Sequence, residues 1–260
     1  MIWYKKDQHF LIDRRVLKRI VEYGNLNSSD TVLEIGAGYG NLTEGLAGRA
    51  GRVIAVEADP ELAASLGRWG NVEAITGDAL KVDFPPFNKV VSNLPYSISS
   101  PITFKLLDHE FEFGILMYQY EFAKRMVARE GSEDYGRLSV TVQYYADVEI
   151  LEVVPGSAFS APPKVRSAIV KLTPRPAKYY VKNEEFFMKF LKAVFSQRRK
   201  KLRNAILNNA VLLGIEASAL GQLPADMLDR RAEILSAQEL SNLADILSDW
   251  TKNLNSNNIP

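Results

Sequence analysis

The chain contains no cysteine and only two histidines, His9 and His109, which lie far apart in the sequence. Disulfide bonds, thiolate nucleophiles and cysteine-ligated metals are therefore excluded. Because two such separated histidines rarely form a metal site, we expect no bound metal. A chain without cysteines also fits a cytoplasmic location, which is the location that we expect.

Long apolar runs are also missing. No stretch approaches the ~18 consecutive apolar residues of a membrane span, and residues 1–7 lack the apolar core of a secretion signal. We therefore expect no membrane contact. With 260 residues, of which 47% are hydrophobic, the chain can form one large domain and one small domain.

Charge is unevenly distributed along the chain, although the net charge is only +1. From Pro174 to the end there are 13 Lys and Arg against 9 Asp and Glu, whereas acidic residues exceed basic ones, 22 to 19, before that point. The densest basic cluster consists of Arg198, Arg199, Lys200, Lys201 and Arg203. Such a cluster indicates contact with a polyanion. The plainer alternative is a solvated face of a helix.

Short β-rich segments alternate with helical patterns through the first 175 residues. The expected strands are residues 31–36, 52–57, 72–76, 89–93, 113–118, 148–154 and 167–172. The expected helices include residues 14–23, 60–68, 100–107 and 120–129. This alternation predicts an open parallel sheet with helices on both faces. The last two strands have no long helix between them and should form an antiparallel pair.

Two prolines at positions 174 and 176 indicate a linker. Beyond it the pattern is helical, over residues 184–195, 198–213 and 237–250. We therefore expect an α/β domain over residues 1–175 and a small all-helical domain over residues 176–260.

A glycine loop follows the first expected strand, at Gly36, Gly38 and Gly40. Glycines allow the backbone to turn sharply and to approach a ligand closely. The dinucleotide fingerprint requires a glycine at position 41, where this chain has Asn41. A dehydrogenase is therefore disfavoured, and the loop suits a ligand without phosphates.

Acidic residues follow the next two strands. Glu57 can accept hydrogen bonds from both hydroxyls of a ribose, and Asp78 can accept one from an adenine amine. Either residue alone would more often be a helix cap or a solvated loop acid. Their recurrence at successive strand ends favours a nucleoside site at the carboxyl edge of the sheet.

The tetrapeptide Asn93-Leu94-Pro95-Tyr96 ends the fourth strand. Asn93 offers a neutral acceptor oxygen, and Pro95 fixes a turn that lets the Leu94 carbonyl point into a pocket. Tyr96 supplies a flat face for stacking. Together they suit the exocyclic amine of an adenine. A simple turn with a core tyrosine is the alternative for so short a motif.

In this order, the strand-end residues resemble those of the S-adenosylmethionine-dependent methyltransferases. The chain as a whole, from Gln8 to Asn204, resembles the small-subunit ribosomal RNA adenine N6,N6-dimethyltransferases, the KsgA group. The resemblance includes Gln8-His9-Phe10-Leu11, residues 34–43, Gly77-Asp78-Ala79-Leu80, the tetrapeptide, Phe159 with residues 162–167, and residues 197–204. At position 9 the family usually has asparagine. The histidine found here resembles the archaeal members of the family.

The resemblance implies a Rossmann-like class I methyltransferase fold with a seven-stranded, mostly parallel sheet, and S-adenosylmethionine as cofactor. It assigns cofactor binding to His9, Leu11, Gly36, Gly38, Glu57, Asp78, Ala79 and Asn93. It assigns catalysis to Asn93, Leu94, Pro95 and Tyr96, with Phe159 as a second stacking ring. It assigns contacts with rRNA phosphates to Arg198, Arg199, Lys200, Lys201 and Arg203.

The implied reaction transfers two methyl groups to each of two adjacent adenosines near the 3′ end of small-subunit rRNA. The implied substrate is an immature 30S particle, so that the reaction is coupled to ribosome assembly. We expect the enzyme to be a monomer.

Three other functions remain open from the sequence. A large-subunit rRNA adenine methyltransferase of the antibiotic-resistance type has a similar tetrapeptide. A DNA adenine methyltransferase usually has an acidic residue in the place of Asn93. A non-catalytic assembly or transcription factor could retain the fold, although the presence of Glu57, Asp78 and Asn93 argues against lost activity.

Overall fold

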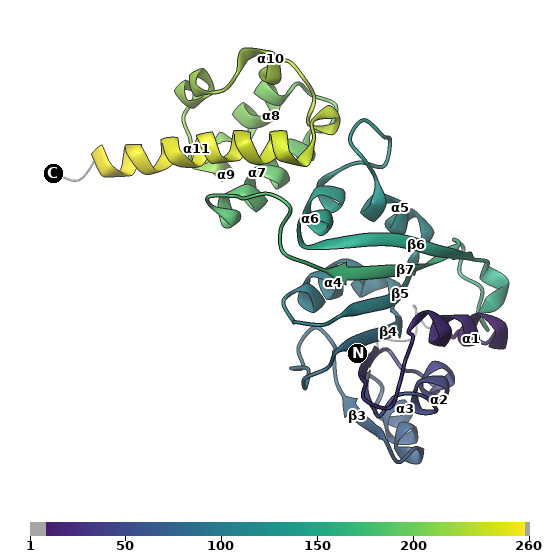
Figure 1. Cartoon of the computed structure of the whole chain (residues 1–260). Coiled ribbons are helices and arrows are strands. Elements are labelled where there is room, and N and C mark those ends of the chain that lie inside the picture. Colours follow the sequence, from purple (N-terminus) through teal and green to yellow (C-terminus); the bar gives the residue numbers. More distant parts are fainter. Residues whose placement is uncertain (1–8, 258–260) are drawn as a thin grey trace. The chain divides into compact units, whose positions relative to one another are not determined.

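The computed structural model describes residues 9–257 and divides into two compact units (Figure 1). The first unit contains the residues up to Lys124 and residues 145–175, and the second contains residues 125–144 and the chain from Pro176 onward. The division after Arg175 lies where the sequence predicts the linker. Residues 125–144, however, belong to the second unit rather than to the α/β domain.

Long-range packing explains this difference. Tyr135 is buried, and its hydroxyl donates to the Leu235 carbonyl at 3.1 Å. Its ring meets that of Phe195 edge-on, with 5.9 Å between the centroids. These contacts join residues 60 or more positions apart in the chain, so local patterns do not reveal them.

The first unit is built on a seven-stranded sheet in the order β3-β2-β1-β4-β5-β7-β6. Its strands are β1 (Thr31–Ile35), β2 (Arg52–Glu57), β3 (Val72–Thr76), β4 (Lys89–Asn93), β5 (Phe113–Gln119), β6 (Ala146–Val154) and β7 (Ser167–Pro174). The first five strands run parallel to one another, and β7 runs antiparallel to both β5 and β6. All seven predicted strands are confirmed, as is the antiparallel pair.

Helices cover both faces of this sheet. One face packs under α1 (Arg14–Tyr23) and α2 (Asn41–Ala47), through a cluster that includes Val32, Val53 and Val91. Because successive strand residues alternate between faces, Tyr118 lies on the other side from Met117, a member of that cluster. There the Tyr118 hydroxyl is 2.8 Å from that of Thr103 in α4 (Ser99–Leu107).

Side-chain caps set where two of the predicted helices begin. The Asp13 carboxylate accepts from the backbone N–H groups of Arg15 and Val16, at 2.8 and 3.3 Å, at the start of α1. Asp59 caps α3 (Pro60–Ser65) in the same way, and proline is favoured at a first helical position. The predicted helix over residues 60–68 continues beyond α3 as a 3₁₀ turn, Leu66–Arg68.

The second unit is helical, as predicted. It contains α7 (Glu184–Ser196), α8 (Leu202–Asn208), α9 (Ala210–Leu213), α10 (Ala225–Leu228) and α11 (Ala237–Asn257). It also holds most of α6 (Arg137–Tyr145), which the sequence analysis missed because β-branched and aromatic residues weaken its helical pattern. α5 (Tyr120–Val127) crosses the division between the units.

The predicted helix over residues 198–213 is wrong at its start. Residues 197–201 form a turn, and helical structure resumes only at Leu202 and breaks again between α8 and α9. Gln197 leaves the helical region with φ −126° and ψ 49°. The Leu202 N–H then donates to the Arg230 carbonyl at 2.7 Å, which holds the chain in its non-helical path. The basic cluster is therefore mostly a turn rather than one face of a helix.

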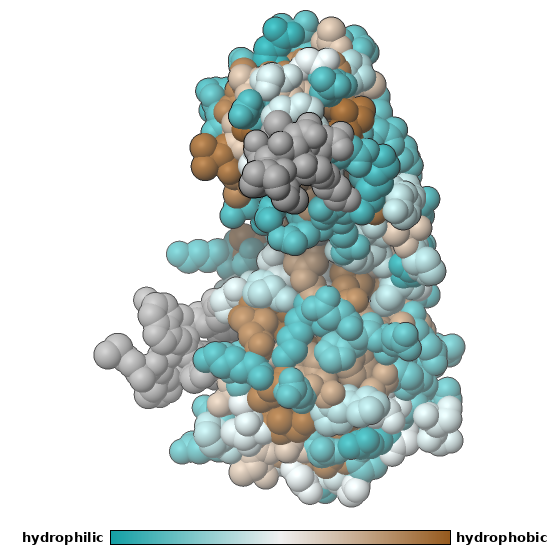
Figure 2. Space-filling view, turned by 90° about the vertical axis from the view of Figure 1, so that its left-hand side faces the viewer, coloured by the Kyte–Doolittle hydropathy of each residue, from teal (hydrophilic) through white to brown (hydrophobic). Residues whose placement is uncertain are grey.

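Apolar side chains gather in separate groups among hydrophilic ones on the face of the molecule shown in Figure 2. Large hydrophobic residues that remain exposed include Tyr39, Tyr180 and Val211. Among the helices that the structure describes, none combines the length and apolar character needed to cross a membrane.

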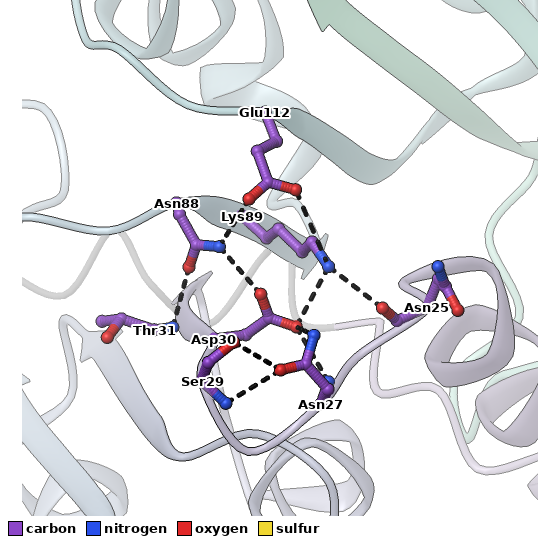
Figure 3. A network of polar contacts seen from close by, with 8 residues as sticks. All are labelled: Asn25, Asn27, Ser29, Asp30, Thr31, Asn88, Lys89 and Glu112. Atoms are coloured by element: carbon purple, nitrogen blue, oxygen red, sulfur yellow. Dashed lines mark hydrogen bonds and ion pairs between the residues drawn. The ribbon is translucent and has the colours of Figure 1, made fainter.

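A buried ion pair joins the amino ends of β1 and β4 (Figure 3). The Lys89 ammonium lies 3.0 Å from the Asp30 carboxylate, and the two side chains are only 5% and 2% exposed. Asn88 donates to Asp30 at 2.8 Å and to Glu112 at 2.9 Å. Burial alone raises the pKa of Asp30, but the hydrogen bonds from Asn88 and Asn27 and the Lys89 charge outweigh it and lower that pKa.

We expect Lys89→Met to lower the free energy of unfolding by about 3–5 kcal/mol, because it leaves the Asp30 carboxylate buried without its cation. The pair of Lys18 with Glu22 provides a matched control, since Lys18 is 72% exposed. Lys18→Met should cost less than about 1 kcal/mol. Urea unfolding of both variants measures the difference, and equal losses would contradict a stabilising role for the buried pair.

Candidate active site

The strands β1 and β4 separate near their carboxyl ends. They pair only at Val32 with Lys89 and at Leu33 with Val90. Beyond this point the Ser92 hydroxyl lies between them, accepting from the Ile35 N–H at 2.5 Å and donating to the Ile35 carbonyl at 3.1 Å. The strand order reverses here, with β2 and β3 on one side and β5 on the other. In open α/β sheets, ligands bind in the crevice that forms at such a point.

A cavity of about 280 Å³ opens in this crevice. Its lining includes most of the site residues that the sequence predicted: His9, Gly36, Gly38, Glu57, Asp78, Ala79, Asn93, Leu94, Pro95 and Tyr96. The sequence analysis did not single out the apolar walls, which include Ile35, Val56 and Ile98. Such residues at strand ends have the same pattern as ordinary core residues, so they carry no separate signal.

At the glycine loop, the cavity is lined by backbone atoms without side chains. Gly36 and Gly38 have φ values of +74° and +57°, which non-glycine residues rarely adopt. A side chain at Gly36 would lie 3.0 Å from the Pro95 ring, and one at Gly38 would lie 2.8 Å from Phe10. Both positions therefore require glycine, for conformation and for space.

Glu57 lies at the end of β2 and is 8% exposed. Its two carboxylate oxygens accept from the Gly38 N–H at 2.8 Å and from the Asp59 N–H at 2.9 Å. An ionised carboxylate has about four acceptor positions, so each oxygen can accept one more hydrogen bond. This geometry fits a pair of vicinal hydroxyls such as those of ribose.

Asp78 follows β3 at the next strand end. One carboxylate oxygen accepts from the Leu80 N–H at 3.0 Å, and the other lies 3.5 Å from the exposed ammonium of Lys81. The Asp78 side chain is 33% exposed. It is thus held in place by its own turn while it keeps acceptor capacity toward the cavity that it lines.

The orientation of the Asn93 amide is set by a distant backbone group. Its nitrogen donates to the His9 carbonyl at 3.2 Å. The amide oxygen is therefore the atom left to accept a hydrogen bond from a ligand. The imidazole of His9 donates in turn to the Ala161 carbonyl at 2.7 Å, which anchors the segment that carries this carbonyl.

Tyr96 lines the same cavity, and both its hydroxyl and its ring are in contact with other side chains. Its hydroxyl is 2.5 Å from that of Ser167 at the start of β7. Its ring is tilted by 34° against the His9 ring, with 5.8 Å between centroids. Burial raises the pKa of Tyr96, so the hydroxyl stays neutral and serves as an anchor.

Leu11 and Phe159 do not line this cavity. They are 3% and 2% exposed and belong to the hydrophobic cluster beneath α1. Their backbones form an isolated antiparallel bridge, and the Leu11 carbonyl accepts from the Asn41 side chain at 2.9 Å. The role of Phe159 as a stacking ring remains a prediction that requires its ring to leave the cluster. Gln8 lies outside the described residues.

The predicted RNA-binding residues lie in the second unit and differ in their surroundings. Arg198 is 2.6 Å from the Glu233 carboxylate, and Lys201 and Arg203 lie 3.3 and 3.6 Å from that of Asp229. Arg199 and Lys200 are exposed and form no ion pair within the part of the chain that the structure describes. These two are therefore the cations most available to a polyanion.

Comparison with known proteins decides the family. The family model "Ribosomal RNA adenine dimethylase" matches residues 4–227. The chain belongs to this family. A relative from Methanosarcina mazei, described as a probable ribosomal RNA small subunit methyltransferase A, is 58% identical over 94% of this chain and 92% of its own length. One of the same description from Halobacterium salinarum is 47% identical over 92% of this chain and 88% of its own length.

Two solved structures are similar over nearly the whole chain. A dimethyladenosine transferase from Plasmodium falciparum has a TM-score of 0.78 and 33% identity, and covers 94% of this chain and 98% of its own. The 23S rRNA methyltransferase ErmE has a TM-score of 0.66 and 28% identity, and covers 92% and 99%. The expected Rossmann-like methyltransferase fold, with its seven-stranded and mostly parallel sheet, is thereby confirmed.

The chain is thus an rRNA adenine dimethyltransferase, and S-adenosylmethionine is the cofactor of its family. The cavity fits this cofactor on its own chemistry. Glu57 has acceptors left for a ribose, the walls are apolar, and Gly36 and Gly38 leave the backbone bare. The Asn41 side chain, at the first position of α2, is engaged by Leu11 rather than left for a phosphate, which suits a ligand without one.

A second carboxyl group lies beneath the glycine loop. Glu34 in β1 is 2% exposed and accepts from the Thr43 hydroxyl at 2.6 Å. Burial raises its pKa to about 8, and the nearby Glu57 carboxylate adds to this effect. Glu34 is therefore protonated at neutral pH in the folded enzyme, and the site carries the charge of Glu57 without a second charge behind it.

This pKa predicts a loss of stability as the pH rises. Unfolded Glu34 ionises near pH 4.5 and the folded residue near pH 8, so the folded state binds the extra proton between these values. Stability should fall across this interval and then level off. The Glu34→Gln variant has no carboxyl group to ionise at this position. Its free energy of unfolding should therefore rise relative to that of the wild type as the pH rises, by up to a few kcal/mol. Urea unfolding at pH 5, 7 and 9 measures this, and parallel pH profiles would contradict it.

Proposed function

We propose that the enzyme dimethylates the exocyclic amines of two adjacent adenosines near the 3′ end of small-subunit rRNA. The substrate would be an immature 30S particle, so that methylation is coupled to assembly in the cytoplasm. The enzyme would act as a monomer and without a metal ion. The small-subunit names of the relatives support the choice of rRNA. The observation that carries the chemistry is the Asn93 amide, whose oxygen is left as an acceptor beside the cofactor cavity.

The residues of the cavity would hold the cofactor by its nucleoside. Glu57 would accept from the ribose hydroxyls, and Asp78 from the adenine amine. Gly36 and Gly38 would let the backbone lie against the cofactor, and the segment at His9 would close the site at its methionine end. S-adenosylmethionine, when bound, supplies an electrophilic methyl group on a positively charged sulfur.

Asn93 and Leu94 would activate the target amine. The lone pair of an adenine amine is delocalised into the ring, which makes the nitrogen a poor nucleophile. If the Asn93 amide oxygen and the Leu94 carbonyl accept its two hydrogens, the nitrogen can become pyramidal and direct its lone pair at the methyl group. Catalysis is then largely positioning. A strong base is not required, because the amine becomes acidic only after methylation and then loses its proton to water.

Tyr96 would stack on the base once it leaves the RNA helix. Its ring is fixed by the hydrogen bond to Ser167 and by contact with His9, so little side-chain entropy is lost when the base enters. Phe159 would provide the second face if the base draws it out of the hydrophobic cluster. The exposed Ser97 beside Tyr96 would leave room for a monomethylated amine.

The proposal is tested with immature small subunits incubated with the enzyme and isotopically labelled S-adenosylmethionine. Mass spectrometry of the rRNA should find two neighbouring N6,N6-dimethyladenosines near the 3′ end. Asn93→Ala should lower the single-turnover rate by about 10²–10³-fold, as does loss of one positioned polar group in other enzymes.

Two outcomes would count against the proposal. Methylation of large-subunit rRNA instead would favour the function of ErmE, whose fold is similar. An Asn93→Ala enzyme of normal rate would remove Asn93 from the chemistry. Asn93→Asp keeps the acceptor oxygen but adds a charge, so it separates loss of the acceptor from loss of neutrality. Calorimetry with S-adenosylmethionine checks that each variant still binds the cofactor.

The available cations of the basic turn give a separate prediction. Arg199→Ala with Lys200→Ala should reduce the slope of log Kd against log salt by about 1.5, the value for two fewer phosphate contacts on single-stranded RNA. Arg198→Ala should lower the slope less and the melting temperature more, because Arg198 is paired with Glu233. Filter binding of small-subunit rRNA at several salt concentrations measures the slopes. A wild-type slope in the Arg199/Lys200 variant would contradict the prediction.

A further inference from the structure

One lysine of α4 contacts the turn of residues 77–82, which follows β3 and is named the β3 turn below. The Lys105 ammonium donates to the Ala79 carbonyl at 2.9 Å and to the Val82 carbonyl at 2.5 Å. It also lies 4.3 Å from the centroid of the Phe84 ring, a favourable place for a cation. All of these residues belong to the first unit. A single side chain thus joins α4 to the turn at the end of β3.

The backbone bonds within the β3 turn leave two of its carbonyls to this lysine. The Asp78 carbonyl accepts from the N–H groups of Lys81 and Val82, at 2.8 and 3.0 Å. The peptide group before Ala79 is fixed by these bonds, and the peptide group after Ala79 is fixed by Lys105. Ala79 is only 7% exposed, and a carbonyl in such a place costs free energy when it has no donor. Lys105 therefore sets the direction of the backbone on the far side of Ala79.

The β3 turn presents both an acceptor and a donor to the cofactor cavity. Asp78 and Ala79 line the cavity. The Asp78 carboxylate keeps acceptor capacity, and the Ala79 N–H has no acceptor within the part of the chain that the structure describes. The edge of an adenine carries the complementary groups, an amine that donates and a ring nitrogen that accepts. The spacing of the two protein groups depends on the shape of the turn.

Lys105 itself is well placed to hold the turn, because α4 is fixed on the sheet. Ile102 is fully buried. The Thr103 hydroxyl donates to the Ser99 carbonyl at 2.7 Å and lies 2.8 Å from the Tyr118 hydroxyl of β5. The Lys105 ammonium forms no ion pair with any described residue. Its charge therefore acts on the two backbone carbonyls and on an aromatic ring rather than on a carboxylate.

We propose that Lys105 is a positioning residue for the adenine of S-adenosylmethionine. Lys105 does not line the cavity, so it acts through the β3 turn, by keeping Asp78 and the Ala79 N–H at the spacing that an adenine edge requires. Rigid support of this kind reduces the entropy cost of binding. The inference rests on the proposed placement of adenine at Asp78, and it adds the residue that makes this place selective for adenine.

The test compares the binding of two ligands by calorimetry. One is S-adenosylhomocysteine, and the other is S-inosylhomocysteine, in which a carbonyl oxygen replaces the adenine amine. The wild type should bind the first at least about 100-fold more tightly, because the second places an oxygen against the Asp78 carboxylate. Lys105→Met should lower this ratio of affinities about 10-fold, because the turn loses two hydrogen bonds from a charged donor.

An unchanged ratio in Lys105→Met would overturn the inference, even if both affinities fell. General destabilisation of the fold weakens both ligands equally, so the ratio separates adenine recognition from stability. Lys105→Arg keeps a cation that can donate to two carbonyls, and it should restore at least half of the lost selectivity on a logarithmic scale. No recovery would contradict a role that depends on the donated hydrogen bonds.

Lys81→Met provides a matched control. Lys81 is a second lysine at the β3 turn, but its side chain is 82% exposed, and its ammonium lies 3.5 Å from the Asp78 carboxylate. Because an exposed ion pair contributes little, the ratio should stay within about 3-fold of that of the wild type. Equal losses in Lys81→Met and Lys105→Met would overturn the inference, since any positive charge near Asp78 would then have the same effect.

Turnover on small subunits separates this role from an effect on the tetrapeptide, because α4 begins three residues after Tyr96. Lys105→Met should raise the KM for S-adenosylmethionine more than it lowers kcat, as expected when binding is lost equally from the ground state and the transition state. A lower kcat with an unchanged KM would overturn the inference and would assign Lys105 to the support of the tetrapeptide.

Failure of the proposed adenine contact is distinguishable from failure of this inference. Asp78→Asn should also lower the ratio, because an amide can donate to the carbonyl oxygen of the inosine ligand. If Asp78→Asn keeps the wild-type ratio while Lys105→Met lowers it, the proposed contact of Asp78 fails, and the role of Lys105 in adenine recognition stands. If Asp78→Asn lowers the ratio and Lys105→Met does not, the inference on Lys105 fails alone.

Discussion

The separation of β1 from β4 is the constraint on which the site depends. Two parallel strands that stayed paired to their ends would leave no crevice at the carboxyl edge of the sheet. The Ser92 hydroxyl takes up both backbone groups of Ile35, so the strands part without leaving a buried N–H or carbonyl unpaired. The glycine loop after β1 and the tetrapeptide after β4 then face each other across the opening, and Pro95 packs directly on Gly36.

Much of this arrangement follows from the sequence because the logic of a parallel sheet is simple. Apolar strands alternating with helices imply that the carboxyl ends of neighbouring strands share one edge. Glu57, Asp78 and Asn93, each at a strand end, therefore had to lie near one another, and the cavity brings them together. The helices α1 and α3 begin at the predicted residues for a local reason, because the side chains of Asp13 and Asp59 cap them.

The remaining features depend on contacts between distant parts of the chain. Nothing near Asn93 in the sequence indicates that its amide is oriented by the carbonyl of His9. The resemblance assigns Phe159 to stacking on the base, but its backbone bridges to Leu11 and its side chain joins the core. Residues 125–144 follow the α/β pattern, but the packing of Tyr135 assigns them to the other unit. Local periodicity has no information on such pairings.

Charge and chemistry are thus divided between different parts of the chain. The Asn93 amide that lines the cavity is neutral, and the deeper carboxyl, Glu34, is kept neutral by burial, so that Glu57 and Asp78 are the acidic side chains at the cavity, and the cofactor of this family is positively charged. A site with more negative charge would bind that cofactor more tightly but would repel the RNA phosphates that must approach it. Among the predicted RNA-binding residues, Arg199 and Lys200 are exposed cations without an ion pair in the described part of the chain, and neither lines the cofactor cavity. Salt should therefore weaken the encounter with RNA much more than the chemical step, because exposed charges are screened whereas a neutral hydrogen bond inside a closed site is not.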